Sequence, residues 1–261
     1  MIRYICCFAL AAACLLAGDL PRVDLHAHID GETPKDKSIT PAEATAISRR
    51  LDVRLGVLGE GGCGGEIHDD RSLAAFLDSL AAQPVWRGLQ VYGFGWSHCL
   101  SKANLDRLDY IAADALIFPQ PDGKKVWLWL PGVQFPDPQD FMDRYVEHNL
   151  RVLSQPIQVW ANPTYLPESL QPRYDALWTA ARMDRLIDAA VKNHVAIEIN
   201  AHFQIPSVTF IKRAKARGAR FSIGSNRHVE GIGEIEYCLR TARKCGLTAK
   251  DIYVPARSLG N

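Results

Sequence analysis

Short apolar runs alternate along the chain with longer segments in which apolar residues recur every three or four positions. The short runs predict buried strands, and the longer spacing predicts helices that cover a sheet. From residue 19 onward this alternation repeats about seven times without a long linker, which predicts a parallel sheet of α/β type. A closed or nearly closed barrel is the natural arrangement for that number of strands.

The individual elements follow from the same periodicity and from turn and cap residues. Strands are predicted at residues 22–27, 54–58, 88–94, 108–113, 157–160, 195–200 and 220–223. Helices are predicted at residues 41–51, 70–83, 137–154, 174–193, 207–217 and 234–245. The Pro-Asp-Gly turn at residues 121–123, followed by the apolar segment 125–130, predicts a β-hairpin inserted after the fourth strand.

The N-terminal segment differs in character from the rest of the chain. Residues 4–18 form an uncharged apolar run behind Arg3, which is typical of a secretory signal peptide. We therefore expect residues 1–18 to be a signal peptide, residues 19–261 to form one barrel domain, and the protein to be exported to the periplasm or the extracellular space. A buried first helix or strand is the alternative. The alanines before Cys14 suit ordinary cleavage, or lipidation of Cys14 in an imperfect lipobox, so a lipid anchor is an alternative to a soluble exported product.

Composition narrows the class of function. The 261 residues include 30 basic and 29 acidic residues, for a formal net charge of +1 at pH 7. Without a basic excess there is no general attraction to phosphate backbones, so nucleic acid is not the expected partner. No apolar stretch reaches the ~18 to 20 residues that span a membrane as a helix. We expect a small-molecule substrate, and the oligomeric state is left open.

Four of the seven cysteines follow the predicted signal peptide, namely Cys63, Cys99, Cys238 and Cys245. An even number permits two disulfides in an oxidising compartment, but the spacing does not decide the pairing. Cys238 and Cys245 are too far apart along a straight helix to form a bridge with each other. Because no Cys-x-x-Cys pair is present, a zinc knuckle is not expected.

The polar residues that end the predicted strands are the candidate functional residues. His26 and His28 lie two apart at the end of the first strand, so both side chains point to one face and can chelate a single metal ion. Polar residues also follow later strands, namely Glu60, Glu198, Asn200, Asn226 and His228. Barrel enzymes assemble their active sites at this carboxyl edge of the strands.

These segments together resemble the PHP family, named for polymerase and histidinol phosphatase. The resemblance covers nearly all of the chain after residue 18 and is carried by VDLHAHIDG at 23–31, AIEIN at 196–200, GARFSIGSNRH at 218–228 and GLTAKDI at 246–252. It implies a single distorted (βα)7 barrel that binds up to three metal ions, usually zinc, manganese or iron. In that family the metal ions activate a water that attacks a phosphoester.

The match to the family is made residue by residue. His26 and His28 match the opening His-x-His ligands, and His228 matches the histidine of the closing Asp-x-His. In that closing motif Asn226 replaces the aspartate, so a neutral amide stands where the family has a carboxylate. After the second strand only Glu60 stands where the family has an aspartate and a histidine.

Two further departures concern the middle of the chain. Asn162 precedes Pro163 where the family has a histidine before a proline, and the glutamate of the third strand is not evident. His98 stands close to the place of that glutamate. With these ligands missing or replaced, a full trinuclear cluster is not expected.

What the resemblance implies is therefore one metal site. His26, His28 and His228 would be ligands, with Glu60, His98 or Asn226 as a fourth. Imidazoles and a carboxylate suit zinc or another first-row metal such as manganese or iron. An open position on such a metal would hold a water whose pKa falls to ~7.

Two charged residues are candidates for catalytic roles. Glu198 would orient a ligand histidine or take a proton, and a purely structural hydrogen-bond acceptor is the alternative. Arg227 would grip a phosphate or carboxylate with its planar guanidinium, and an exposed loop charge is the alternative.

The remaining histidines and tryptophans are weaker candidates. His68, His148 and His194 are expected on the surface, whereas His202 follows a strand closely enough to enter the site. The tryptophans at 96, 127, 129 and 160 are expected mainly in the core or the hairpin. Trp96 and Trp160 fall at strand ends, and the alternative is that they line a pocket for a flat ligand.

The leading hypothesis is an exported metal-dependent hydrolase of the PHP type that acts on a phosphoester. An amidohydrolase or deaminase is a second reading, because the opening LPRVDLHAHIDG also resembles that of adenosine deaminases, although the expected paired aspartates near the end are missing. A third is a degenerate barrel that has lost catalysis and serves as an exported binding protein.

Overall fold

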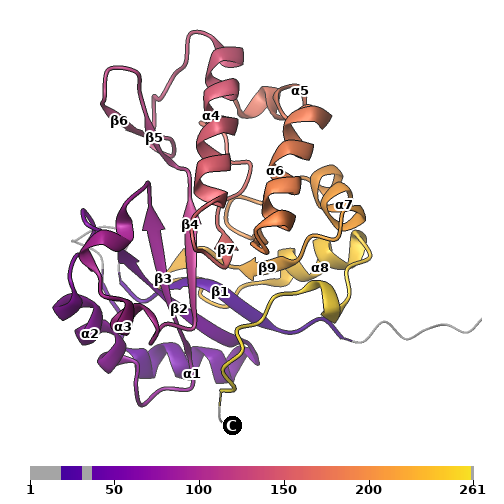
Figure 1. The fold of residues 1–261 in the computed structure, drawn as a ribbon. Helices are drawn as coiled ribbons and strands as arrows, with labels where there is room; N and C mark the ends of the chain where they lie inside the picture. The colour runs from indigo at the N-terminus through magenta and orange to yellow at the C-terminus, as the bar shows by residue number, and fades with distance from the viewer. Residues whose placement is uncertain (1–18, 31–36, 260–261) are drawn as a thin grey trace, which may run out of the picture.

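The computed structural model describes residues 19–30 and 37–259, and the predicted signal peptide with Cys14 lies outside them. The described chain is an α/β fold built on an eight-stranded parallel sheet with the strand order β10-β1-β2-β3-β4-β7-β8-β9 (Figure 1). These strands are β1 (Val23–His28), β2 (Arg54–Gly61), β3 (Trp86–Tyr92), β4 (Tyr110–Asp114), β7 (Val159–Trp160), β8 (Ala196–Asn200), β9 (Phe221–Gly224) and β10 (Arg227–His228).

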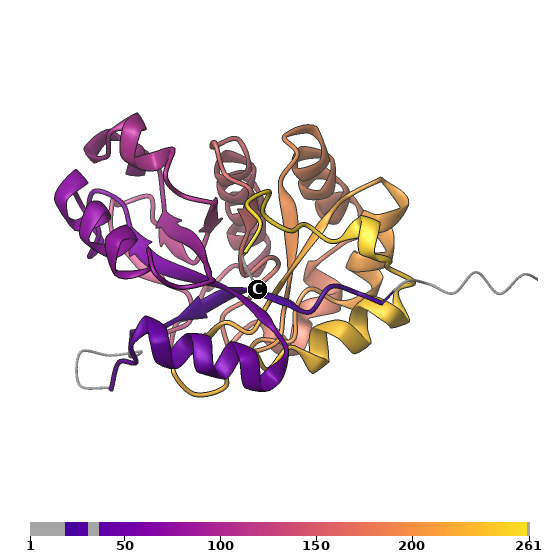
Figure 2. The same cartoon turned by 90° about the horizontal axis from the view of Figure 1, so that it is seen from below.

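Helices follow most of the strands and lie around the outside of the curled sheet (Figure 2). The α-helices are α1 (Pro41–Leu51), α2 (Asp70–Ser79), α3 (Lys102–Leu105), α4 (Pro138–Leu153), α5 (Tyr174–Leu177), α6 (Ala180–Lys192), α7 (Val208–Ala216) and α8 (Glu236–Lys244). Short 3-10 helices are η1 (Trp96–Cys99), η2 (Gln171–Arg173) and η3 (Ala249–Asp251). In the described part of the chain, none of these helices has the length and apolar character that crossing a membrane requires.

The two ends of the strand order meet because β9 and β10 follow each other directly in the chain. β10 pairs in parallel with β1, with His28 opposite His228 in the register. Just before β10, the backbone N–H of Asn226 donates to the backbone carbonyl of His26 at 2.8 Å. The last strand thus returns to the first, and the predicted barrel-like α/β architecture is confirmed in this form.

Most of the predicted elements are confirmed with small shifts at their ends. The helix at 41–51 is found as predicted, because Thr40 caps it and Glu43 completes a capping box. The helix predicted at 70–83 ends at Ser79 instead, four residues before Gln83. Pro84 follows, and a proline disfavours helical backbone in the residue before it.

The single helix predicted at 174–193 was wrong, since the structure has two helices there, α5 and α6. Trp178 leaves the helical region with ψ 71°, and Thr179 caps the new helix by accepting from the Arg182 amide. The Trp178 indole donates to the Thr164 carbonyl at 2.9 Å, so a tertiary contact stabilises the break.

The predicted hairpin is confirmed as an antiparallel pair, β5 (Ile117–Pro119) and β6 (Lys125–Trp127). It projects beside α4 (Figure 1). One of the two permitted disulfides is present among the described residues and links Cys63, in the loop after β2, to Cys99 at the end of η1. Cys238 and Cys245 are buried thiols.

Candidate metal centre

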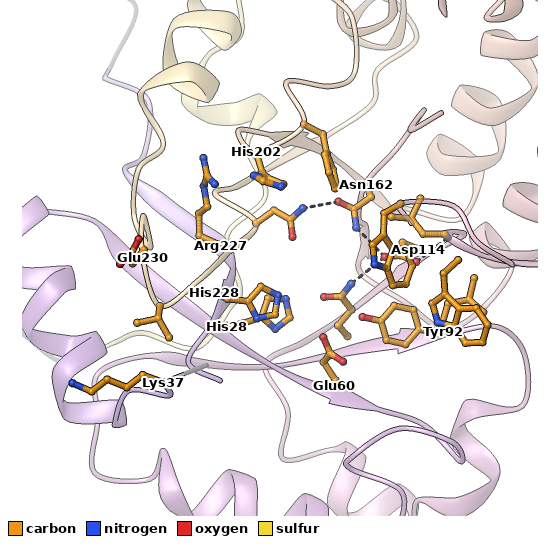
Figure 3. Close-up of a pocket in the computed structure, with 18 residues that line it drawn as sticks. His28, Lys37, Glu60, Tyr92, Asp114, Asn162, His202, Arg227, His228 and Glu230 are labelled. Atoms are coloured by element: carbon orange, nitrogen blue, oxygen red, sulfur yellow. Dashed lines mark hydrogen bonds between the residues drawn. The ribbon is translucent and has the colours of Figure 1, made fainter. Parts of the chain in front are cut away.

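A cavity of about 750 Å³ opens at the carboxyl ends of the strands (Figure 3). This is the edge at which a parallel barrel presents its functional residues. The polar side chains of the cavity come from strands β1, β2, β3, β4 and β10 and from loops, among them those after β7, β8 and β9. They are His28, Lys37, Glu60, Gln90, Tyr92, Asp114, Asn162, His202, Asn226, Arg227, His228 and Glu230. Most of the residues singled out from the sequence therefore share one cavity.

Within this cavity His28, Glu60 and His228 form the tightest group of metal-ligand side chains. One ligand atom from each lies within 4.8 Å of the other two. The rings of His28 and His228 stack with their centroids 4.4 Å apart. His28 is buried, and the other two residues are half-buried. Two imidazoles and a carboxylate at this spacing fit a divalent first-row metal ion.

The electrostatics of this group favour the metal-binding form of His28 and disfavour the carboxylate form of Glu60. Burial lowers the pKa of His28 well below its ordinary value, and the neighbouring His26 and His228 lower it further. The neutral imidazole is the form that donates its lone pair to a metal. Burial and the charge of Glu66 raise the pKa of Glu60. A cation bound beside Glu60 would lower that pKa and favour the carboxylate.

His26 lies beside this group, in contact with Glu198. Its Nδ1 is 2.6 Å from the Glu198 Oε1, and both side chains are at most 2% exposed. Burial disfavours the charged imidazole, but the ion pair with Glu198 outweighs it and raises the pKa of His26. The other ring nitrogen, Nε2, is buried and has no hydrogen-bond partner among the described residues. His26 is therefore oriented by a carboxylate, as metal-binding histidines commonly are.

Glu198 is held by the surrounding backbone and side chains. Its carboxylate accepts from the backbone N–H of Asn162 at 2.7 Å and from Asn200 Nδ2 at 3.0 Å, in addition to its contact with His26. Burial disfavours its charge, but His26 and these hydrogen bonds outweigh burial and lower the pKa of Glu198. A Cβ on Gly224 would lie 2.0 Å from its Oε1, so only glycine fits beside it. This geometry agrees with a positioning role.

Asn226 takes part in a network of amides. Asn162 Oδ1 accepts from Asn226 Nδ2 at 3.1 Å and from Asn200 Nδ2 at 2.9 Å. Asn162 Nδ2 in turn donates to Asp114 Oδ2 at 2.9 Å. Asn226 and Asn162 both adopt left-handed backbone, with φ of 51° and 48°, which asparagine tolerates better than most residues. The side-chain amide of Asn226 therefore hydrogen-bonds to Asn162, and Asn226 does not belong to the group of His28, Glu60 and His228.

Asp114 is a functional candidate that the sequence reasoning missed. Its carboxylate accepts from Gln90 Nε2 at 3.0 Å and from the Leu116 amide at 3.0 Å, besides Asn162. Burial raises the pKa of Asp114 to about 6, against the opposing effect of these hydrogen bonds. The available signal was its place at the end of the apolar strand 110–114, the same signal that pointed to Glu60.

His98 is not brought to this cavity. It is exposed in η1, and neighbouring Cys99 is joined to Cys63. The ring of His98 lies against Gly95, where an added Cβ would meet its Nδ1 at 3.2 Å. The turn after β3 therefore directs His98 away from the ligands, and the structure does not place it with the candidate metal group.

The tryptophans at the cavity are those of the hairpin. Trp127 and Trp129 line it and are 41% and 40% exposed. Trp96 and Trp160 are buried in the core, as mainly expected, and neither lines the cavity. Trp160 packs in the core, and its indole donates to Asn149 Oδ1 at 3.0 Å. An alternating hairpin predicts exposed aromatics on one face, which was the available signal.

Arg227, Lys37 and Glu230 are further charged side chains of the lining. Arg227 and Lys37 border the cavity, and His202 also reaches it as expected (Figure 3). Arg227 is half-buried and therefore is not simply an exposed loop charge. The site combines three candidate metal ligands with guanidinium and ammonium groups, which are the groups that bind phosphoryl or carboxylate oxygens.

No protein-family model matches the chain, and no curated protein matches its sequence. Among solved structures, an archaeal ribonuclease P bound to mature tRNA matches with 12% identity over 86% of this chain and 89% of that chain, at a TM-score of 0.40. A D-hydantoinase matches with 14% identity over 78% of this chain and 46% of that chain, at a TM-score of 0.36. A β-mannanase from Streptomyces thermolilacinus matches with 13% identity over 88% of this chain and 77% of that chain, at a TM-score of 0.40. Likenesses of this degree do not bear on function.

Proposed function

We propose that this protein is a metal-dependent hydrolase of the PHP type that acts on a phosphoester. The observation that carries the proposal is the convergence of His28, Glu60 and His228 at the carboxyl edge of the sheet. The order of β1 to β4, β7, β8 and the interrupted β9 and β10 supports a (βα)7 arrangement of the PHP type.

The donor set fits a single divalent ion, with zinc as the proposed metal and manganese or iron as alternatives. His28, Glu60 and His228 would hold it, and His26 stands beside them with a buried ring nitrogen that lacks a partner among the described residues. A bound divalent ion supplies Lewis acidity for a phosphoryl oxygen and makes a water more acidic.

The chain's own residues would bind and orient the substrate. Arg227 and Lys37 would pair with the anionic phosphoryl oxygens, because both border the cavity that contains the ligands. Glu198 would hold the Nδ1 proton of His26 and so keep Nε2 as the lone-pair atom. Trp127 and Trp129 would cover an apolar part of the substrate and restrict water at the cavity mouth.

The proposal is tested by hydrolysis of p-nitrophenyl phosphate after removal of metal and re-addition of zinc or manganese. We expect activity that depends on metal and falls at least about a hundredfold in His228→Ala, since a lost ligand removes the metal from the site. His68→Ala is the matched control, because His68 is an exposed histidine away from the cavity. Metal-independent hydrolysis, or equal activity in His228→Ala, would contradict the proposal.

A non-catalytic binding protein is the second candidate. Asn162 and Asn226 bond to each other where the PHP family has a histidine and an aspartate, so the carboxylate that would offset metal charge is missing. Stoichiometric metal binding without turnover, and gain of turnover in Asn226→Asp, would favour this candidate over the hydrolase.

Export to the periplasm or extracellular space, with or without a lipid on Cys14, also stays a proposal. The disulfide between Cys63 and Cys99 is compatible with it, because such bonds persist in oxidising compartments. Mass spectrometry of the protein from its native host would test it by identifying the mature N-terminus and any lipid on it.

A further inference from the structure

The hairpin presents two exposed tryptophans to the cavity of the candidate metal centre. Trp127 and Trp129 line this cavity and are 41% and 40% exposed, whereas Leu128 between them is fully buried. Among the residues that the structure describes, four large hydrophobic side chains are exposed, and these tryptophans are two of the four. Apolar surface that stays exposed inside a concave site is where the apolar part of a ligand packs.

The tryptophans belong to an apolar wall of the cavity. Four apolar residues from the hairpin and the turn before it line the cavity, and we call them the hairpin wall: Leu116, Ile117, Trp127 and Trp129. Ile117 lies opposite Trp127 in the antiparallel register. The backbone N–H of Leu128 donates to the Leu116 carbonyl at 2.9 Å. Pairing on both sides of the turn therefore holds the wall in place.

The opposite face of the hairpin is anchored in the core. The ring of Phe118 is 1% exposed and lies edge to face with Phe141, Tyr145 and His148 of α4, at centroid distances of 5.3, 5.7 and 5.6 Å. His148 is only 5% exposed, so the expectation that it lies on the surface was wrong. Because α4 supports the hairpin from behind, the hairpin wall is a preformed surface.

The two ends of the cavity differ in character. Arg227, Lys37 and Glu230 lie on one side of the two ligand histidines, His28 and His228 (Figure 3). Asp114, which ends β4, lies on the other side (Figure 3). The hairpin begins three residues after it, at Ile117. The cationic groups and the hairpin wall are therefore separated by the candidate metal group.

The hairpin wall fits an apolar ring better than an ionic or a hydroxyl-rich group. None of its four residues is charged, and its polar side-chain atoms are the indole nitrogens of Trp127 and Trp129. A sugar ring would bury several hydroxyl groups that need partners, and burying them without partners is unfavourable. The cavity of about 750 Å³ is in the size range that encloses a drug-sized ligand, so it holds more than a phosphoryl group.

Given the proposed hydrolase function, on which this step rests, we propose that the substrate is a phosphoester whose alcohol is a flat aromatic ring. The phosphoryl group would lie at the candidate metal group, and the ring would pack against Trp127 and Trp129. Indole faces bind such a ring offset-stacked or edge to face. Hydrolysis would break the bond between phosphorus and the ester oxygen. Water would supply a hydroxyl to phosphorus and a proton to the leaving phenol.

The test is calorimetric titration of the full protein, with zinc present, with three phosphonates that cannot be hydrolysed. Phenylphosphonate carries the flat ring, methylphosphonate lacks it, and cyclohexylphosphonate carries an apolar ring of similar size without a π face. We expect phenylphosphonate to bind at least about tenfold tighter than methylphosphonate, and about threefold tighter than cyclohexylphosphonate. Absence of phenylphosphonate binding, or equal binding of either of the others, would overturn the proposal.

Variants locate the ring. Trp127→Ala and Trp129→Ala are each expected to weaken phenylphosphonate binding about fivefold to tenfold and to leave methylphosphonate binding unchanged, because each removes ring contact alone. Trp127→Phe should keep most of the affinity. Phe94→Ala and Leu130→Ala are the matched controls, since both side chains are exposed large hydrophobics that do not line this cavity. Unchanged phenylphosphonate binding in both tryptophan variants would overturn the proposal.

The ring preference and the hydrolase function fail separately. Ring-selective phosphonate binding without hydrolysis of p-nitrophenyl phosphate would contradict the hydrolase and support the ring site. Metal-dependent hydrolysis of p-nitrophenyl phosphate with no difference among the three phosphonates would support the hydrolase and overturn the ring site.

Discussion

Single buried polar residues set the character of the candidate metal centre. His28 is held neutral by burial, and His26 is oriented by the carboxylate of Glu198 at 2.6 Å. Spacing on a strand pointed to His28, and the resemblance to the PHP family pointed to Glu60 and His228. The structure brings these three side chains together.

Other residues were not predictable from position along the chain. His98 follows the end of β3 by six residues, but it lies in η1 beside the Cys63 to Cys99 disulfide and does not line the cavity. Asp114 and Asn162 were not recognised as partners, because they become neighbours only when β4 and β7 pair. Long-range pairing of this kind leaves no local pattern.

The contact between Glu198 and His26 gives a prediction for a single residue. Glu198→Gln removes the charge that orients His26 while keeping the size of the side chain, so we expect zinc affinity to fall about tenfold to a hundredfold. Competition with a zinc-binding dye would measure it. Glu236→Gln is the control, because Glu236 pairs with Arg22 at the surface. Unchanged affinity in Glu198→Gln would show that Glu198 and His26 are purely structural.

At the scale of elements, periodicity predicted the strands, most helices and the hairpin, and it failed where tertiary contacts decide. The break between α5 and α6 depends on the Trp178 indole reaching the Thr164 carbonyl, which lies in the loop after β7. The hairpin was predicted by its turn residues, whereas its packing beside α4 and the burial of His148 depend on the fold.

The packing of His148 between α4 and the hairpin predicts a pH dependence of stability. Burial lowers the pKa of His148 to about 4 in the folded protein, so between pH 6.5 and 4 the unfolded chain binds more protons at this residue. Stability should therefore fall as the pH falls through that range, by up to about 3 kcal/mol from this group.

Urea unfolding of the wild type and of His148→Phe at pH 7 and pH 4.5 measures this effect. We expect the loss of unfolding free energy on acidification to be smaller in His148→Phe by about 2 to 3 kcal/mol. His68→Phe, at an exposed histidine, should behave like the wild type. An equal loss in the wild type and in His148→Phe would mean that the hairpin does not shield His148.

For the whole molecule, the alternation of strands and helices was sufficient to predict an α/β barrel-like fold. It did not show how the barrel closes. β9 ends at Gly224 and β10 begins at Arg227, so residues 225–226 interrupt the strand. After this interruption β10 pairs with β1, with His228 opposite His28. His228 and His28 are 200 positions apart in the sequence, and only the folded chain brings them together.

The near balance of 30 basic and 29 acidic residues leaves recognition to local groups. One such group is the candidate metal centre, which Trp127 and Trp129 of the hairpin also line.

The central claim is that His28, Glu60 and His228 bind one metal ion. Anomalous diffraction at the zinc edge, from crystals of the protein grown with zinc, tests it most directly. We predict one anomalous peak within bonding distance, ~2.0 to 2.2 Å, of a ligand atom from each of the three residues. Zinc bound only elsewhere, or no peak among these three side chains, would contradict the claim.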